Sequence, residues 1–237
     1  ALHARAGCPN LFIKIPGNRA GIPAIEESIA AGIPINVTLL FSTEQCLAAA
    51  DAYRRGNERR LAAKMTPVRS VASLFVSRWD KAVADAVPPS LRNRLGIAVA
   101  QQTYRAWREM YTAPAWRRLG GAGVPEQRLL WASTGTKDPA ASDVLYVEAL
   151  AAPDTIITMP DETLLALADH GKVNTVLPED GGDSTAVIAQ FGEAGVDIAA
   201  LAAHLQQEGA QSFTKSWEDL IGCIAAKRAA IPASHAA

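Results

Sequence analysis

Five short apolar runs, each followed by a stretch of helical character, constrain the fold of this chain more than any other feature. Their length and composition are typical of β-strands. The runs cover residues 11–15, 35–41, 68–76, 128–133 and 155–159. Strands that alternate with helices are typical of parallel βα units. The sequence therefore predicts an α/β fold built on a parallel sheet.

Capping residues and glycines set the expected limits of several helices. Ser42 is followed by Gln45 at the spacing of a capping box, which predicts a helix start. Gly56 is expected to end that helix, and Gly209 is expected to end a helix near the C-terminus. The helices expected in the last part of the chain cover residues 184–194, 197–208 and 212–230.

The overall composition excludes several classes of function. With 49% hydrophobic residues and a net charge of -1, the chain gives no reason to expect a nucleic-acid or anionic-membrane partner. No apolar run reaches the roughly 18 residues of a membrane span. Cys8, Cys46 and Cys223 are far apart and odd in number, which favours reduced thiols in a cytosolic protein. The histidines lack ligand spacing, so no metal site is expected.

Side chains alternate across a strand, so each predicted strand has two faces. In the second strand this alternation puts Leu39 on the same aliphatic face as Val37. In the fourth strand it groups Ser133 with Leu129 and Trp131 on a mixed face. The aliphatic faces suit packing on helices. The chemically distinctive residues expected on the opposite face are Lys14, Asn36, Thr38, Ser73 and Ser133.

Lys14 in the middle of the first apolar strand is the strongest functional signal. A buried ammonium without a partner is costly and favours losing its proton. The neutral amine is a nucleophile that forms Schiff bases with carbonyl substrates. Two plainer interpretations remain: Lys14 faces water on an edge strand, or it pairs with a carboxylate.

Polar residues near the strand ends suggest a polyol phosphate as ligand. Asn36 and Thr38 have the groups to hold sugar hydroxyls, although such residues are often simply satisfied within a barrel. Arg78, Ser133 and Lys137 have the groups to bind a phosphate. The alternative for Arg78 and Lys137 is an ordinary solvated charge.

Several long motifs in this chain resemble the transaldolase family, in that family's order. They read NLFIKIPGNRAGIPAIEESIAAGIPINVTLLFS at residues 10–42 and SVASLFVSRWD at residues 70–80. Two more read RLLWASTGTKDPAASDVLYVEAL at residues 128–150 and TIITMPDETLLALADHG at residues 155–171. The pattern is most similar to the larger bacterial transaldolases, which carry extra C-terminal helices.

The resemblance implies a role for each matched residue. Lys14 would form the Schiff base with sedoheptulose 7-phosphate or fructose 6-phosphate and pass a dihydroxyacetone unit to an aldose phosphate, in the pentose phosphate pathway. No metal or organic cofactor would be needed. The residues implied to contact the sugar are Asn36, Thr38, Ser73 and Phe75. Those implied to hold its phosphate are Arg78, Ser133 and Lys137.

The resemblance also implies a partial (β/α)8 barrel within a single domain spanning residues 1–237. The five strands would be the fourth to the eighth, followed by a helical extension at about residues 184–231. The family's aspartate acid/base and its water-activating glutamate lie on earlier strands, so neither has a counterpart here. Two alternatives follow: a fructose-6-phosphate aldolase-like enzyme, or an inactive fragment that only binds sugar phosphates. The oligomeric state is left open.

Overall fold

A single parallel sheet organises the computed structural model, which describes residues 1–230. Its five strands lie in the order β1-β2-β3-β4-β5, so each strand pairs with its neighbours in sequence. The predicted parallel α/β architecture is therefore confirmed, and every strand end lies within two residues of the expected one. The strands are β1 (Ile13–Pro16), β2 (Ile35–Leu40), β3 (Ser70–Phe75), β4 (Arg128–Ala132) and β5 (Thr155–Ile157).

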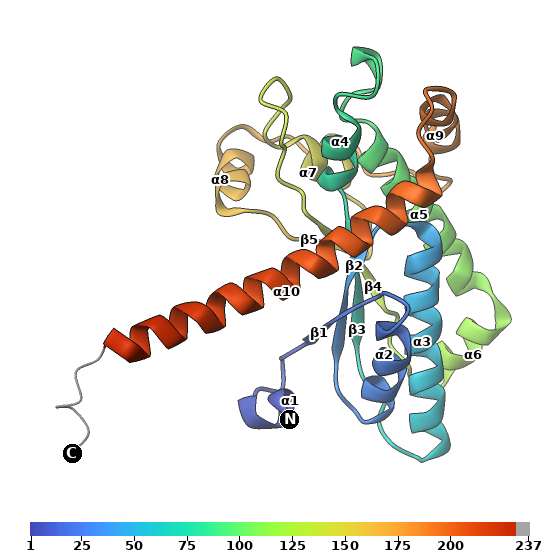
Figure 1. The fold of residues 1–237 in the computed structure, drawn as a ribbon. Coiled ribbons are helices and arrows are strands. Elements are labelled where there is room, and N and C mark those ends of the chain that lie inside the picture. The colour runs from blue at the N-terminus through green and yellow to red at the C-terminus, as the bar shows by residue number, and fades with distance from the viewer. Residues whose placement is uncertain (231–237) are drawn as a thin grey trace.

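Helices follow the strands and cover the sheet unequally (Figure 1). Those after the first three strands are α2 (Gly21–Ala30), α3 (Thr43–Ala62), α4 (Ser77–Val83), α5 (Leu95–Thr112) and α6 (Pro114–Gly121). Those nearer the C-terminus are α7 (Leu145–Ala149), α8 (Asp161–His170), α9 (Ser184–Glu193) and α10 (Ile198–Ala230). A short α1 (Leu2–Ala6) and a 3-10 turn (Pro89–Leu91) complete the described elements.

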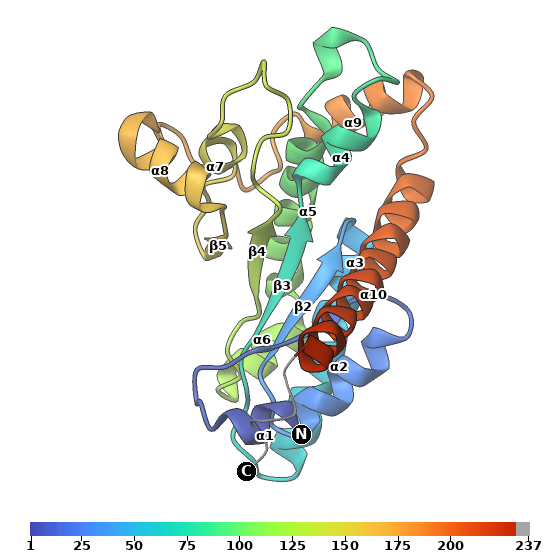
Figure 2. The same cartoon turned by 60° about the vertical axis from the view of Figure 1, so that its left-hand side comes forward.

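Two apolar clusters lie on opposite faces of the sheet. The first joins Val37, Ala72 and Trp131 to residues of α2, α3 and α5, such as Ile29. The second joins Phe75 and other residues of the opposite face to α4, α5, α9 and the first part of α10. Figures 1 and 2 show α10 crossing the sheet on the side away from α2 and α3, and then continuing beyond it.

Two glycines that were expected to end helices lie inside them instead. Helix α3 continues through Gly56 to Ala62, and α10 continues through Gly209. A Cβ atom on Gly56 would lie 2.6 Å from Cβ of Ile29 in α2. A Cβ atom on Gly209 would lie 2.7 Å from Cδ2 of Leu39. Both glycines therefore permit close packing. The expected break between residues 208 and 212 is wrong, and residue 231 of the expected extension lies outside the described residues.

The alternation of side chains fails at one place in β2. The pairing of β2 with β3 passes from Val37–Ala72 to Leu40–Leu74, so two residues of β2 oppose Ser73. Leu39, one of these two residues, has a left-handed backbone with a φ of 57°. It packs in the second cluster, whereas Val37 packs in the first. The prediction that Leu39 shares a face with Val37 is therefore wrong, because a β-bulge intervenes.

Candidate active site

Lys14 lies on β1 with its side chain on the face opposite the helices α2 and α3. Its strand neighbours Ile13 and Ile15 pack against the first cluster, so Lys14 points the other way. The parallel register pairs Lys14 with Asn36 of β2. Lys14 is exposed, since β1 pairs only with β2 in the described sheet. Burial of the amine is therefore wrong, and the alternative that Lys14 faces water on an edge strand is the one observed.

Asn36 and Ser73 join this face from the next two strands. The Ser73 hydroxyl donates a 2.7 Å hydrogen bond to Oδ1 of Asn36. Ser73 is 2% exposed, whereas Asn36 is half-buried. Because Oδ1 of Asn36 accepts this bond, the amide N–H groups are the donors that Asn36 has for a ligand. Three neighbouring strands thus contribute an amine, an amide and a hydroxyl to one face.

Thr38 adds a hydroxyl with no partner at the carboxyl end of β2. The residue is 1% exposed, and its Oγ1 makes no hydrogen bond within the described part of the chain. A buried hydroxyl without a partner costs free energy unless a ligand or water satisfies it. This group is therefore available for an interaction that the polypeptide itself does not supply.

Phe75 connects this strand cluster to a group of cations. Its ring lies 5.4 Å from the ring of Phe41, centroid to centroid, and is largely buried. The guanidinium carbon of Arg78 lies 5.0 Å from the Phe75 ring centroid, close enough for a cation–π interaction. Phe75 therefore orients Arg78 at the start of α4.

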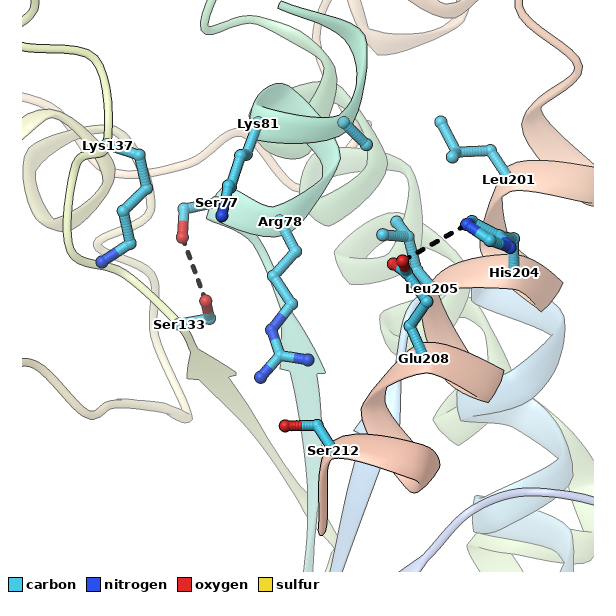
Figure 3. A pocket seen from close by; sticks show the side chains of 11 residues that line it. Ser77, Arg78, Lys81, Ser133, Lys137, Leu201, His204, Leu205, Glu208 and Ser212 are labelled. Carbon is cyan, nitrogen blue, oxygen red and sulfur yellow. Dashed lines mark hydrogen bonds and ion pairs between the residues drawn. The ribbon is translucent and has the colours of Figure 1, made fainter. Parts of the chain in front are cut away.

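A cavity of about 810 Å³ opens beside Arg78, between α4, the loop after β4, and α10 (Figure 3). Arg78 and Lys81 from α4 face it, as does Lys137 from the loop after β4. Oγ of Ser77 lies 3.0 Å from Oγ of Ser133 on the same wall. The concentration of cations and hydroxyls makes this cavity suitable for an anion such as a phosphate group.

The backbone conformation of Ser133, and not the alternation of side chains along β4, brings its hydroxyl to the cavity. Leu129 and Trp131, with which it was grouped, pack in the first cluster beside the helices. The expectation that all three share the polar face is therefore wrong. Ser133 has a left-handed backbone with a φ of 56°, which ends the strand pattern and directs the hydroxyl toward Ser77.

The predicted residues thus form two adjoining groups rather than one pocket. Lys14, Asn36, Thr38 and Ser73 lie on the strands, whereas the residues predicted for a phosphate line the cavity. Lys14 is not among the residues of the described chain that line the cavity.

Several residues of this region were missed by sequence reasoning. Ser77 and Lys81 flank Arg78 on α4, and their i, i+4 spacing on one helix face was a usable signal. His204 and Glu208 of α10 also line the cavity, with Nε2 and Oε1 3.5 Å apart. No local signal connects α10 to the strands, because the contact joins distant parts of the chain.

Asp80 anchors the helix that carries Arg78. Its Oδ1 accepts a 2.8 Å hydrogen bond from the backbone N–H of Leu95, at the start of α5. Its Oδ2 accepts from the N–H of Gly96 at 3.2 Å and from the hydroxyl of Tyr146 at 2.8 Å. Burial raises the pKa of Asp80 to about 6, although these three donors oppose the shift. The carboxylate ties α4 to α5 and α7.

Other chemistry is limited within residues 1–230. No group of three or more His, Cys, Asp or Glu side chains there could hold a metal ion. Cys8, Cys46 and Cys223 are free thiols. None of the described helices is by itself long and apolar enough to cross a membrane, and only α9 and α10 together, bent by 91°, meet that criterion.

Comparison with known proteins gives consistent matches along the chain. The family model described as Transaldolase/Fructose-6-phosphate aldolase matches residues 1–224. The transaldolase of Neisseria meningitidis serogroup A is 41% identical over 222 residues, which cover 93% of this chain and 63% of that protein. The transaldolase of Parafrankia sp. is 44% identical over 227 residues, with 91% and 61% covered. The transaldolase of Thiobacillus denitrificans is 42% identical over 225 residues, with 91% and 63% covered. The chain thus spans somewhat less than two thirds of the length of these relatives.

Proposed function

Because this chain belongs to the transaldolase/fructose-6-phosphate aldolase family, we propose that it acts as a transaldolase in which Lys14 forms the Schiff base. The main support is the parallel register that pairs Lys14 with Asn36, on the face where Ser73 bonds to Asn36. An amine beside an amide and a hydroxyl suits a polyhydroxy ketone, whose carbonyl and hydroxyl groups need such partners.

In the proposed reaction, the amine of Lys14 attacks the ketone carbon of a ketose phosphate after it has given up its proton. Loss of water gives an iminium. When a base removes the proton of the C4 hydroxyl, C4 becomes an aldehyde carbon, the C3–C4 bond breaks, and the iminium accepts its electron pair. The departing fragment is an aldose phosphate, and the remaining three-carbon unit stays on Lys14 as an enamine. That enamine attacks the aldehyde carbon of a second aldose phosphate, and hydrolysis then frees the amine. The lysine itself supplies the electrophile, so these steps require no metal or organic cofactor.

The strand residues would orient the sugar. Asn36 would donate its amide N–H groups to substrate hydroxyls, since its Oδ1 already accepts from Ser73. The buried hydroxyl of Thr38 has no partner among residues 1–230, and a substrate hydroxyl or a water would satisfy it. Phe75 would contact the carbon chain of the sugar and keep Arg78 in place.

The cavity beside α4 would hold the phosphate. Arg78 provides a planar fork of donors, and Lys137 and Lys81 provide point charges. Ser133 and Ser77 add hydroxyls on the same wall. A dianionic phosphate placed among these groups would be favoured by charge and by hydrogen bonds together.

We further propose that the five strands are the fourth to eighth strands of a (β/α)8 barrel, within one domain that ends in α9 and α10. The sequential all-parallel order of the five strands supports this proposal. In such a barrel, catalytic residues lie near the carboxyl ends of the strands. The catalytic carboxylates of the family would then come from the other strands.

Borohydride trapping tests the assignment of Lys14. Fructose 6-phosphate and borohydride should reduce the iminium to a stable secondary amine, which peptide mapping locates. Lys14→Met should abolish the adduct, whereas Lys64→Met, at an exposed position, should leave it intact. A stable adduct at any lysine other than Lys14 would refute the assignment.

Two other functions are separated by further measurements. The exposure of Lys14 favours a protein that binds sugar phosphates without reacting, and such a protein would bind fructose 6-phosphate but give no trapped adduct. An aldolase would release free dihydroxyacetone when no acceptor is present, whereas a transaldolase would require erythrose 4-phosphate or another aldose phosphate for turnover.

A further inference from the structure

Gln206 of α10 makes a contact that joins the two strands of the proposed sugar site. Its Nε2 donates to the backbone oxygen of Gly17 at 3.2 Å and to that of Leu39 at 3.0 Å. A primary amide has two N–H groups, so one side chain satisfies both carbonyls. The partners are 189 and 167 residues away in sequence, and the contact therefore depends wholly on the docking of α10.

The two carbonyls lie close in sequence to the residues proposed to act on the substrate, Gly17 three residues after Lys14 and Leu39 next to Thr38. Gly17 comes after Pro16 at the end of β1, and its N–H donates to the oxygen of Thr38 at 2.8 Å. This bond extends the β1–β2 pairing one residue past the strand that carries Lys14. Leu39 comes directly after Thr38. Gln206 thus holds the ends of both strands at the point where their regular pairing stops.

The backbone at Leu39 needs such support. Its φ of 57° lies in the left-handed region, which is unfavourable for a residue with a branched side chain. This conformation belongs to the bulge that sets the position of Thr38 relative to Ser73. A donor that binds the Leu39 carbonyl in this orientation stabilises the bulge against the regular strand conformation.

The neighbouring residues of α10 explain how Gln206 comes within reach. Leu205 is 4% exposed and packs in the second cluster. Gly209 lies one turn later, where a Cβ atom would be 2.7 Å from Leu39 and 3.4 Å from Nη1 of Arg78. The helix therefore rests closely on the bulge, and Gln206 lies between two residues that fix its height above the sheet.

We propose that Gln206 is a positioning residue for Lys14 and Thr38. Its effect on the reaction rests on the proposed function. By binding the carbonyls of Gly17 and Leu39 together, it fixes the end of the Lys14 strand against the bulge. The Lys14 amine and the Thr38 hydroxyl then keep fixed positions relative to each other and to the carbonyl group of a bound substrate. Gln206 itself does not line the cavity of the described structure and acts through the strand ends.

Gln206→Met tests this proposal, because methionine preserves the length of the side chain and removes both donors. The neighbouring Gln207 is exposed on the same helix, so Gln207→Met is the matched control. The rate of borohydride-trapped adduct formation at saturating fructose 6-phosphate should fall by about fivefold or more in Gln206→Met, the factor expected for a lost hydrogen bond. The concentration for half-maximal rate should change less, and Gln207→Met should match the parent protein.

Hydrogen exchange gives a second test that does not depend on activity. The N–H of Gly17 bonds to Thr38 at one end of the β1–β2 pair, and the N–H of Ile13 bonds to Pro34 at the other end. Gln206→Met should speed exchange at Gly17 by about fivefold and leave Ile13 unchanged. Equal exchange at Gly17 in Gln206→Met and Gln207→Met would overturn the proposal. If exchange responds but the parent protein forms no adduct, the positioning of the strand ends stands and the proposed function fails.

Discussion

The close packing of α2 on α3 depends on Gly56, and replacing this residue gives a sharp test of the fold. In Gly56→Ala, the new methyl group would lie 2.6 Å from both Cβ and Cγ2 of Ile29. It would also lie 2.9 Å from the backbone oxygen of Glu26. Because these atoms belong to the backbone or to the base of a β-branched side chain, they have little freedom to move.

Two opposing effects set the change in the free energy of unfolding that Gly56→Ala should cause. Alanine in a helix interior is favoured over glycine by about 1 kcal/mol. Forcing a methyl group into a well-packed core costs about 1–3 kcal/mol. Separation of the helices would also strain the ion pairs between them, such as Arg55–Glu26 at 2.6 Å and Arg59–Glu27 at 2.5 Å. The first two terms leave a net cost of about 0–2 kcal/mol, and the strain on the ion pairs adds to it. We therefore expect Gly56→Ala to lower the free energy of unfolding by about 1–2 kcal/mol, the upper part of that range.

Urea unfolding followed by circular dichroism measures this change, and Gly222→Ala is its control. Gly222 lies within α10, and a Cβ atom there would meet no atom within 4 Å. Its replacement should therefore be neutral or stabilising by up to about 1 kcal/mol. If Gly56→Ala were as stable as the parent or more so, the view of Gly56 as a packing residue would be refuted.

Three further predictions concern charges. Arg78→Met should weaken the binding of inorganic phosphate by about tenfold or more, as expected for losing a charged hydrogen-bond donor, and calorimetric titration against Lys64→Met would show no difference if Arg78 does not bind phosphate. Because burial raises the pKa of Asp80 to about 6, the unfolded state releases this proton first, and the contribution of Asp80 to stability should fall by about 1–3 kcal/mol as pH rises from about 4 to 6. Urea unfolding across this pH range should show that slope in the parent and lose it in Asp80→Asn. The ring N–H groups of protonated His170 donate to Asp143 and Asp169, and these bonds raise the pKa of His170. Asp143→Asn should therefore lower that pKa in an NMR titration, and an unchanged value would show that the Asp143 contact is absent in solution.

The strands could be predicted from the sequence because burial imposes a simple pattern on them. Residues 35–40 and 70–75 are almost entirely buried, so both segments are rich in apolar residues. The placement of Asn36 and Ser73 on one face follows from alternation, which is a local property of extended chain. These parts of the site needed no knowledge of distant contacts.

The rest of the site depends on contacts that a linear pattern does not contain. Leu39 and Ser133 leave the regular alternation because their backbones are left-handed. Neither is a glycine, so the sequence carries no signal for this conformation. Glycine is common at helix ends, so Gly56 and Gly209 look like helix ends in the sequence. Only the atoms close to them in the structure show that both are packing positions within helices. Burial of Lys14 was expected from its apolar neighbours, but exposure depends on which strands lie beside β1.

The bulge in β2 contains a residue, Leu39, that strand pairing does not require but that the contact with α10 does. Because Thr38 and Leu39 together oppose Ser73, a chain shortened by Leu39 would still direct Leu40 and Phe41 to their present sides. Such a deletion would keep every strand pair and yet deprive α10 of the carbonyl and the side chain on which it rests. One inserted residue thus serves as the landing point for a segment more than 160 positions away. A bulge of this kind lets one strand of a regular parallel sheet bind a distant helix that the other strands do not bind in this way.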